Sequence, residues 1–364
     1  MHADWDNVIQ CDPVCRVSVY QLVRVQICGV FLRMEYGLIP DEPLAAGVRR
    51  VACTQIDRAV GELTSARDPH RSVHEARKCM KRVRALLHLI RPAIGEKTFK
   101  KEDRRIRDMG RRLSGPRDCQ AIIETVAKLE NGSGPAWDIS ATQTLKAKLY
   151  SERRRAEREL YRHTLEETVA ELAETREHYG HLNLKGGRSR IGDGLQRCYR
   201  RARHDFMRAY EQKRAEDFHE WRKSAQRHWR QMQLLCRAWP EAMEARISAA
   251  GDLSRLLGDD HDLAVLVDRV EAQKKSLGKD WDMSAFQAAC ASRQDELRHS
   301  ARDLGKFLFV ERPSIFRQRM DAYWKAARDV AKDEGGAVTP AKLQNGAAPR
   351  KTDPAPEPRR PSTP

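Results

Sequence analysis

Cationic side chains recur at helical spacing in the stretch from 73 to 91, VHEARKCMKRVRALLHLIR. Its apolar residues return every three or four positions, as on the buried face of an amphipathic helix. A second stripe returns at the same step beside the first and consists of His74, Arg77, Lys78, Lys81, Arg84 and His88. Arginine can bind two phosphate oxygens at once and lysine is a compact positive charge, so this stripe could bind a polyanion. A solvated helix face is the alternative interpretation.

The same basic pattern occurs a second time in the chain. Residues 74–82 and 219–227 share five identities in nine at an offset of 145, and residues 108–118 match 252–262 at four positions at an offset of 144. This repeat predicts two similar bundles of about four helices. If the bundles pack face to face, their stripes line one groove; the opposite packing would place them on outer surfaces. The second stripe consists of His219, Arg222, Lys223, Arg227 and Arg230.

Four further arginines are candidates for the same site, and for Arg111 and Arg117 a surface ion pair is the alternative interpretation. Arg111 and Arg117 lie near the repeated turn, and Arg200 and Arg203 share a face of the helix that opens the second half.

The paired histidines, His74 and His219, have three interpretations. A metal site is the weakest, because each helix supplies one imidazole in a His-Glu-x-x-Arg segment. A structural hydrogen bond and a phosphate contact remain open. A phosphate contact would strengthen binding below about pH 6.5, the unperturbed pKa of histidine.

Residues for catalysis are not visible. We expect Asp118 and Asp262 to begin fourth helices, where a carboxylate caps free amides, and this reading is favoured over catalysis. The segment Gly192-Asp193-Gly194 is interpreted as a short turn and not as a phosphate loop, because no strand precedes it. No catalytic residue, metal site or cofactor is therefore predicted.

Composition points to a polyanionic partner. The chain has 364 residues and a formal net charge of +16, with 33% charged and 6% aromatic residues, which suits a helical protein with an aliphatic core. No apolar run reaches the roughly 20 residues of a membrane span, so no membrane association is predicted. Nine scattered cysteines without a CxxC pair favour a reducing compartment, and we expect a cytoplasmic protein.

The predicted helices follow each other along the chain after residue 40. They cover 41–64, 73–91 (ended by Pro92), 98–113, 118–129, 138–177, 191–214, 217–239, 241–257, 261–273, 282–304 and 314–331. Residues 1–37 are predicted to be an N-terminal extension, disordered or not native, with translation starting at Met1 or Met34. The helical domain is expected at 38–332, with halves at about 38–179 and 188–332, and residues 333–364 as a disordered tail.

The paired segments resemble one known family. The His-x-x-Arg-Lys segments at 74–78 and 219–223, with the turn segments at 113–118 and 257–262, resemble the CHAD family, the conserved histidine α-helical domain. The resemblance covers roughly residues 38–331. It implies an all-α domain of two pseudo-symmetric four-helix bundle halves with extra helices, and a basic groove or channel between them that binds inorganic polyphosphate. It also implies association with bacterial polyphosphate granules.

Some members of that family also carry a CYTH triphosphatase, but no barrel of that kind is visible here. The resemblance therefore implies binding and not hydrolysis. Gln226 and Trp229 stand where the family pattern has Lys and Arg, so we expect the first half to contribute more charge.

The function expected from the sequence is non-catalytic binding of inorganic polyphosphate. The fourteen expected ligands are His74, Arg77, Lys78, Lys81, Arg84, Arg111, Arg117, Arg200, Arg203, His219, Arg222, Lys223, Arg227 and Arg230. The alternatives are a nucleic-acid-binding helical protein and an enzyme that hydrolyses phosphate chains. Chain-length preference, oligomeric state and the role of the tail are not readable from the sequence.

Overall fold

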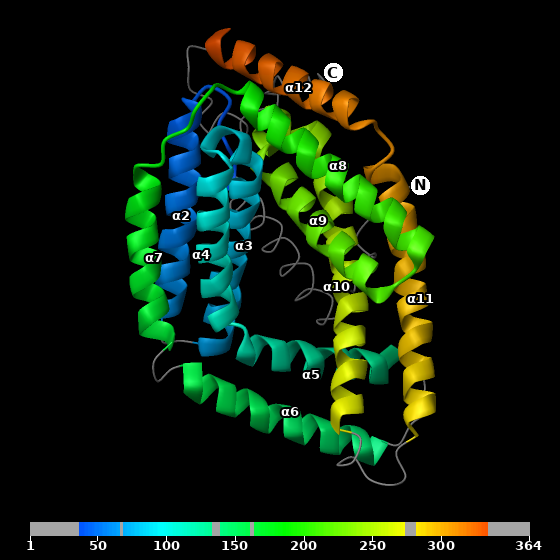
Figure 1. The fold of residues 1–364 in the computed structure, drawn as a ribbon. Coiled ribbons are helices and arrows are strands. Elements are labelled where there is room, and N and C mark those ends of the chain that lie inside the picture. The colour runs from blue at the N-terminus through cyan, green and yellow to red at the C-terminus, as the bar shows by residue number, and fades with distance from the viewer. Residues whose placement is uncertain (1–35, 66–67, 133–138, 161–163, 274–281, 334–364) are drawn as a thin grey trace, which may run out of the picture.

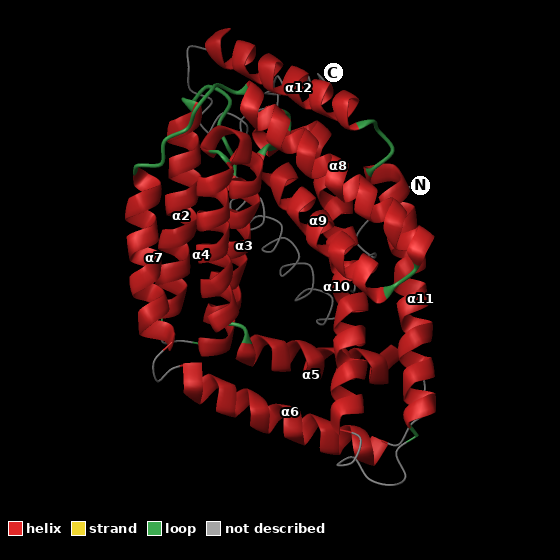
Figure 2. Ribbon diagram, in the orientation of Figure 1, coloured by secondary structure: helices red, strands yellow, loops and turns green. Residues whose placement is uncertain are grey.

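The computed structural model describes residues 36–65, 68–132, 139–160, 164–273 and 282–333. Within these residues the regular structure is helical and no strand occurs, which confirms the all-α fold class (Figure 2). None of the described helices is long and apolar enough to cross a bilayer. Met34 and the predicted tail from residue 334 onward lie outside the described residues.

The first half of the described chain contains six helices. They are α2 (Leu44–Thr64), α3 (Pro69–Ile94), α4 (Glu96–Arg112), α5 (Gly115–Gly132), α6 (Ile139–Glu159) and α7 (Leu165–Gly180). α2 packs against both α3 and α7, α4 packs on α3, and α5 pairs with α6. Figure 1 shows α2, α3, α4 and α7 as a roughly parallel group, with α5 and α6 crossing below it.

The second half repeats this order of contacts. Its helices are α8 (Ser189–Gln212), α9 (Ala215–Leu234), the 3₁₀ turn η2 (Cys236–Ala238), α10 (Pro240–Gln273), α11 (Met283–Leu308) and α12 (Pro313–Asp333). α9 packs against both α8 and α10, α10 packs on α11, and α12 packs on α8 as α7 packs on α2. α10 and α11 form the side of the molecule opposite α2 and α7 (Figure 1).

The halves meet where α3 packs on α8 and α9, and where α5 packs on α10. Gly194 of α8 makes the α3 contact close, because a Cβ built there would lie 1.8 Å from the backbone oxygen of Leu89. Gly192, Asp193 and Gly194 therefore lie inside α8, and the short turn that we expected there is wrong. The small residue lets two helix backbones approach each other.

α3 has the two stripes that its sequence predicts. Asp68 caps the helix by accepting a hydrogen bond from the Arg71 amide at 3.1 Å, and Pro69 occupies the first turn. The apolar stripe is buried throughout, with Val73, Ala76, Met80, Val83, Leu87 and Ile90 all at 3% exposure or less. The basic stripe beside it is only half-buried.

Three predicted helix boundaries are wrong. Pro92 lies inside the last turn of α3, which continues to Ile94. The expected helix 138–177 is two helices, α6 and α7, because the first packs on α5 and the second on α2. The two expected helices around Gly258 are one continuous α10, so Asp262 lies within a helix and caps none. Buried leucines at 253, 257, 263 and 266 keep the helical step through Gly258.

The described part begins earlier than the predicted domain. Tyr36, which we assigned to the N-terminal extension, is 1% exposed and belongs to the main core. Its hydroxyl donates to the carbonyl oxygen of Arg82 at 3.0 Å, and the amide of Leu38 donates to the carbonyl oxygen of Leu234 at 2.8 Å. Tyr36 therefore belongs to the folded domain.

Candidate polyanion-binding groove

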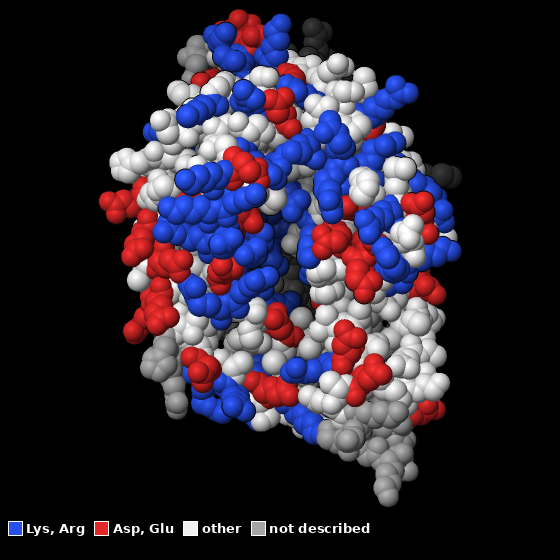
Figure 3. All heavy atoms as spheres, viewed as in Figure 1, with Lys and Arg blue, Asp and Glu red and all other residues white. Residues whose placement is uncertain are grey.

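A groove of about 580 Å³ lies between α3, α4, the start of α5 and α9. We call it the basic groove, and its lining residues are Arg77, Met80, Lys81, Arg84, Ala85, His88, Ile106, Arg107, Gly110, Arg111, Ser114, Asp118, His219, Lys223, Gln226, Arg227 and Arg230. Eight of these are Lys or Arg and one is a carboxylate. Figure 3 shows Lys and Arg gathered on both sides of a hollow in the middle of this face.

Half of the cationic lining is neutralised by carboxylates. Arg84 binds both oxygens of Asp103, at 2.9 and 3.1 Å. Lys223 donates to Glu220 at 2.7 Å. Asp108 accepts from Arg107 at 3.1 Å and also lies 3.9 Å from Arg111. These pairs reduce the positive potential that their cations contribute to the groove.

The other half, Arg77, Lys81, Arg227 and Arg230, forms no ion pair with a carboxylate of the described chain. Arg77 donates to the carbonyl oxygen of Gly110, and Arg230 donates to that of Gln226 at 3.1 Å. Both contacts orient a guanidinium without neutralising it. We call these four residues the unpaired cations.

Arg230 is the clearest sign of an anion site. Its residue exposure is 6%, and its guanidinium carbon lies 5.2 Å from the centre of the Trp229 ring. Burial lowers the pKa of Arg230 to about 10, so the side chain is still charged at neutral pH. A buried charge without a counter-charge is unfavourable, and a bound anion would remove that penalty.

Lys81 has the most perturbed ammonium group of the groove. Burial is the main cause that lowers its pKa to about 7, and the guanidinium groups of Arg230, Arg222, Arg77 and Arg117 lower it further. At neutral pH, part of the Lys81 amine is therefore unprotonated. An entering polyanion would favour the charged form of Lys81.

A second hollow of about 290 Å³ continues the basic groove toward α8. The two share His88, Lys223 and Arg227, and the second adds Arg91, Arg197 and Arg201. Pro92 contributes to this junction, because a proline cannot donate to the carbonyl oxygen of residue 88 within the helix. That oxygen accepts instead from Arg197 at 2.9 Å, which ties α8 to α3 beside the groove.

The sequence profile described as the CHAD domain matches residues 50–271. The chain belongs to the CHAD domain family. No curated protein matches it in sequence.

Two solved CHAD-like structures share the fold. The crystal structure of the CHAD domain from the plant Ricinus communis has 17% sequence identity and a TM-score of 0.52, covering 73% of this chain and 94% of that one. PptA from Streptomyces chartreusis has 14% identity and a TM-score of 0.51, covering 74% of this chain and 98% of that one. At such identities the likeness concerns the fold alone.

Of the fourteen residues predicted from the sequence, eight line the basic groove of this CHAD domain. They are Arg77, Lys81, Arg84, Arg111, His219, Lys223, Arg227 and Arg230. Four others lie around it: His74, Lys78, Arg117 and Arg222. Arg117 and Arg222 both act on the charge of Lys81, whereas Lys78 donates to Glu75 at 2.7 Å and Arg117 to Glu124 at 3.2 Å.

Arg200 and Arg203 do not line the groove. Arg200 is exposed, and Arg203 donates to the carbonyl oxygen of Phe309 at 3.0 Å, on the side of α8 that meets the end of α11. Arg197 and Arg201 occupy the face of α8 that borders the second hollow. The i, i+4 spacing of Arg197 and Arg201 could have indicated from the sequence that this face of α8 is basic. Arg107 and Arg111 have the same spacing on α4.

The histidines of the two repeats have comparable surroundings. Burial is the main cause that lowers the pKa of His74 to about 4, with Arg117 and Lys78 adding to it. At the offset of 144, His261 corresponds to Arg117, and the Nδ1 atoms of His219 and His261 lie 3.1 Å apart. Each repeat thus places a cationic or imidazole neighbour from the turn segment beside its histidine.

The arginines after these histidines also share a relationship. Asp118 favours the charged form of Arg77, and Asp262 does the same for Arg222. Each aspartate thus offsets part of the charge of its basic stripe, although neither forms an ion pair with that arginine in the described chain. In the residues that the structure describes, no group of three His, Cys, Asp or Glu side chains could hold a metal ion.

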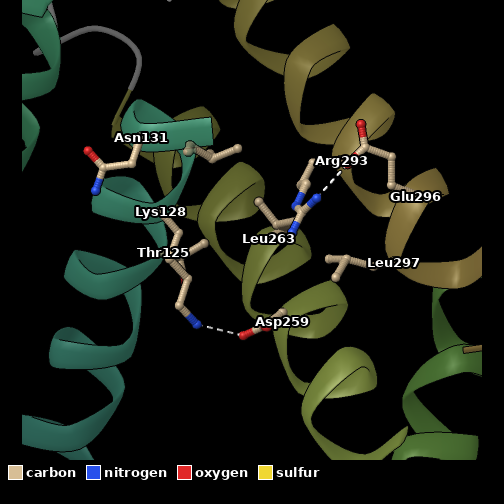
Figure 4. Close-up of a pocket in the computed structure, with 9 residues that line it drawn as sticks. Thr125, Lys128, Asn131, Asp259, Leu263, Arg293, Glu296 and Leu297 are labelled. Carbon is tan, nitrogen blue, oxygen red and sulfur yellow. Dashed lines mark hydrogen bonds and ion pairs between the residues drawn. The ribbon is translucent and has the colours of Figure 1, made fainter. Parts of the chain in front are cut away.

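Another hollow, of about 360 Å³, lies between α5, α10 and α11. Three of its nine lining residues are leucines. Its charged residues pair among themselves: Lys128 with Asp259 at 2.7 Å and Arg293 with Glu296 at 2.5 Å (Figure 4). Because these charges are balanced, this hollow does not share the electrostatic character of the basic groove.

Proposed function

We propose that this CHAD domain binds inorganic polyphosphate in the basic groove and does not cleave it. The observation that carries the proposal is the set of unpaired cations, Arg77, Lys81, Arg227 and Arg230, which line one groove. Bound phosphates would supply the missing counter-charge and release condensed counterions into solution. Binding should therefore weaken steeply as the salt concentration rises.

The groove suits a phosphate chain better than a nucleic acid. Its described lining contains no Phe, Tyr or Trp ring, whereas proteins that bind single strands usually stack bases on aromatic side chains. Polyphosphate has no bases to stack and carries about one negative charge per phosphate. The second hollow, with Arg91, Arg197 and Arg201, would accept further phosphates of the same chain.

Hydrolysis is the second alternative. Among the lining residues that the structure describes, Asp118 is the one carboxylate, and it favours the charge of Arg77. We assign Asp118 a role in orienting that cation.

In the cell, we expect the protein in the cytoplasm at polyphosphate granules, which fluorescence microscopy of a tagged chain would test.

A competition titration tests the proposal. Fluorescent long-chain polyphosphate is bound to the protein and displaced with either unlabelled polyphosphate or unstructured RNA of equal total charge. We expect polyphosphate to displace the probe at a concentration at least about tenfold lower than RNA. Equal displacement by RNA would favour a nucleic-acid binder. Phosphate release from polyphosphate with added Mg²⁺ would contradict the non-catalytic part.

A further inference from the structure

Among the described residues, Lys81 has no acidic partner, unlike the other two lysines nearest to the groove. Lys78 donates to Glu75 and Lys223 donates to Glu220, each at 2.7 Å, so both amines act as ammonium donors. Lys81 forms no such pair in the described chain. The charged groups that act on it most strongly are guanidinium groups from three elements, Arg77 of α3, Arg117 of α5 and Arg222 and Arg230 of α9.

This placement makes the amine of Lys81 nucleophilic. Its pKa of about 7 leaves a large share of the amine unprotonated at neutral pH, and an unprotonated lysine in a desolvated, cationic site is an activated nucleophile. The side chain lines a groove that is open to solvent, so a small reagent can reach it. The neighbouring guanidinium groups of Arg77 and Arg230 are suited to hold the phosphate part of such a reagent.

We propose that Lys81 is a site of covalent acylation by acyl phosphates, the mixed anhydrides of a carboxylic acid and phosphoric acid. The proposal rests on the proposed function only in requiring that the groove holds phosphate groups. Arg77 and Arg230 bind the phosphate of the donor, which places its carbonyl carbon beside the Lys81 nitrogen. The same cations stabilise the negative charge of the departing phosphate.

The reaction balances without any further reagent. The Nζ lone pair attacks the carbonyl carbon, a C–N bond forms, and the bond between that carbon and the bridging phosphate oxygen breaks. The electron pair leaves with inorganic phosphate, and one proton of the amine passes to phosphate or water. The product is an amide that carries no charge.

Acylation would regulate the groove, because it removes one of the four unpaired cations. The modified protein should bind polyphosphate more weakly, and bound polyphosphate should shield Lys81 from acyl donors. Occupancy of the groove and modification of Lys81 would thus exclude each other.

Acetylation kinetics test the proposal on the intact chain. The protein is incubated at pH 7 with acetyl phosphate, and acetylation at each lysine is followed by peptide mass spectrometry. Lys97 and Lys325, both exposed, are internal references. We expect Lys81 to react at least about tenfold faster than either, and excess long-chain polyphosphate to abolish this advantage. Either of two results would overturn the acylation proposal: a Lys81 acetylation rate no higher than the rates of the reference lysines, or no protection of Lys81 by polyphosphate that binds the same sample.

A phosphate-free donor, the N-hydroxysuccinimide ester of acetic acid, isolates the role of the phosphate. Arg77→Gln should lower the Lys81 rate with acetyl phosphate more than with this ester; equal decreases would contradict phosphate guidance. Polyphosphate affinity is measured on the same samples by titration. If the protein binds polyphosphate tightly but Lys81 is not acylated preferentially, the acylation proposal fails and the proposed function stands. If Lys81 is acylated preferentially but polyphosphate does not bind, the acylation proposal is supported and the proposed function fails.

Discussion

The Nδ1 atoms of His219 on α9 and His261 on α10 lie 3.1 Å apart, and their ring centres are 4.3 Å apart. One nitrogen must donate its hydrogen while the other accepts it, so the contact requires at least one neutral ring. Burial is the main cause that lowers the pKa of His261 to about 4, and Arg222, His219 and Lys223 lower it further. The pKa of His219 is also lowered, mainly by burial, so the neutral form of both rings is favoured at pH 7.

This pair predicts a loss of stability in acid. Because the folded-state pKa of His261 lies below its unfolded value of about 6.5, its contribution is present above pH 6.5 and is lost as the pH falls toward 4. With allowance for solvent screening, we expect about 1 kcal/mol between pH 7 and 5. Urea unfolding in phosphate-free buffer should show a shallower pH dependence for His261→Gln. An unchanged slope would contradict the assignment.

Lys81 predicts that polyphosphate affinity falls as the pH rises. Its pKa of about 7 describes the empty groove, and bound phosphates favour the ammonium form, so binding takes up a proton above pH 7. The dissociation constant should increase by up to about tenfold per pH unit above 7. Titrations at pH 6, 7 and 8 at constant ionic strength measure this. Lys81→Arg should flatten the profile, and an unchanged profile in that variant would assign the proton elsewhere.

The pairing of Asp103 with Arg84 predicts that removing this carboxylate tightens polyphosphate binding. Its carboxylate neutralises Arg84, a residue of the groove lining, through two hydrogen bonds. Asp103→Asn should release that cation and lower the dissociation constant for polyphosphate by about three- to tenfold. Asp259→Asn, which breaks an ion pair with Lys128 outside the groove, is the matched control. Weaker binding in Asp103→Asn would show that Arg84 needs this partner to stay in position.

The close approach of α8 to α3 at Gly194 predicts that a larger side chain there lowers the stability of the fold. A Cβ there would lie 1.8 Å from the Leu89 backbone oxygen, so Gly194→Ala should force α8 away from α3 and lower the unfolding free energy by about 3 kcal/mol or more. Gly61 in α2 has open space around its added Cβ. Gly61→Ala should therefore raise stability by roughly 0.5–1 kcal/mol. Equal stabilities of the two variants would contradict the contact.

The fold was largely predictable because helical periodicity in this chain is strong. The apolar stripe of α3 was read from spacing alone, and every predicted member of it is buried. Local sequence signals for helix ends were wrong where long-range packing determines whether a helix continues. Gly258 resembles a turn residue, yet α10 continues through it because the buried side chains on both sides keep one face. Pro92 resembles a helix end, but the freed His88 carbonyl finds a partner in Arg197 of the other half.

The site was predictable at the level of stripes but not of individual pairs. Repetition placed Arg77 and Arg222 on equivalent helices. No spacing shows that Asp103 would neutralise Arg84, or that Arg230 would have no carboxylate partner among the described residues. The face of α8 that borders the second hollow depends on how α8 rotates against α3. For that reason Arg197 and Arg201, and not Arg200 and Arg203, border it.

The central claim is that polyphosphate is bound by the unpaired cations of the basic groove. Its most direct test is the polyphosphate affinity of Arg77→Gln/Arg230→Gln beside that of Arg200→Gln/Arg255→Gln, which removes the same charge from exposed sites. Both are measured by titration at one salt concentration, with folding checked by circular dichroism. The groove variant should lose about 100-fold or more in affinity and the surface variant under about threefold. Equal losses in the two folded variants would contradict a groove site.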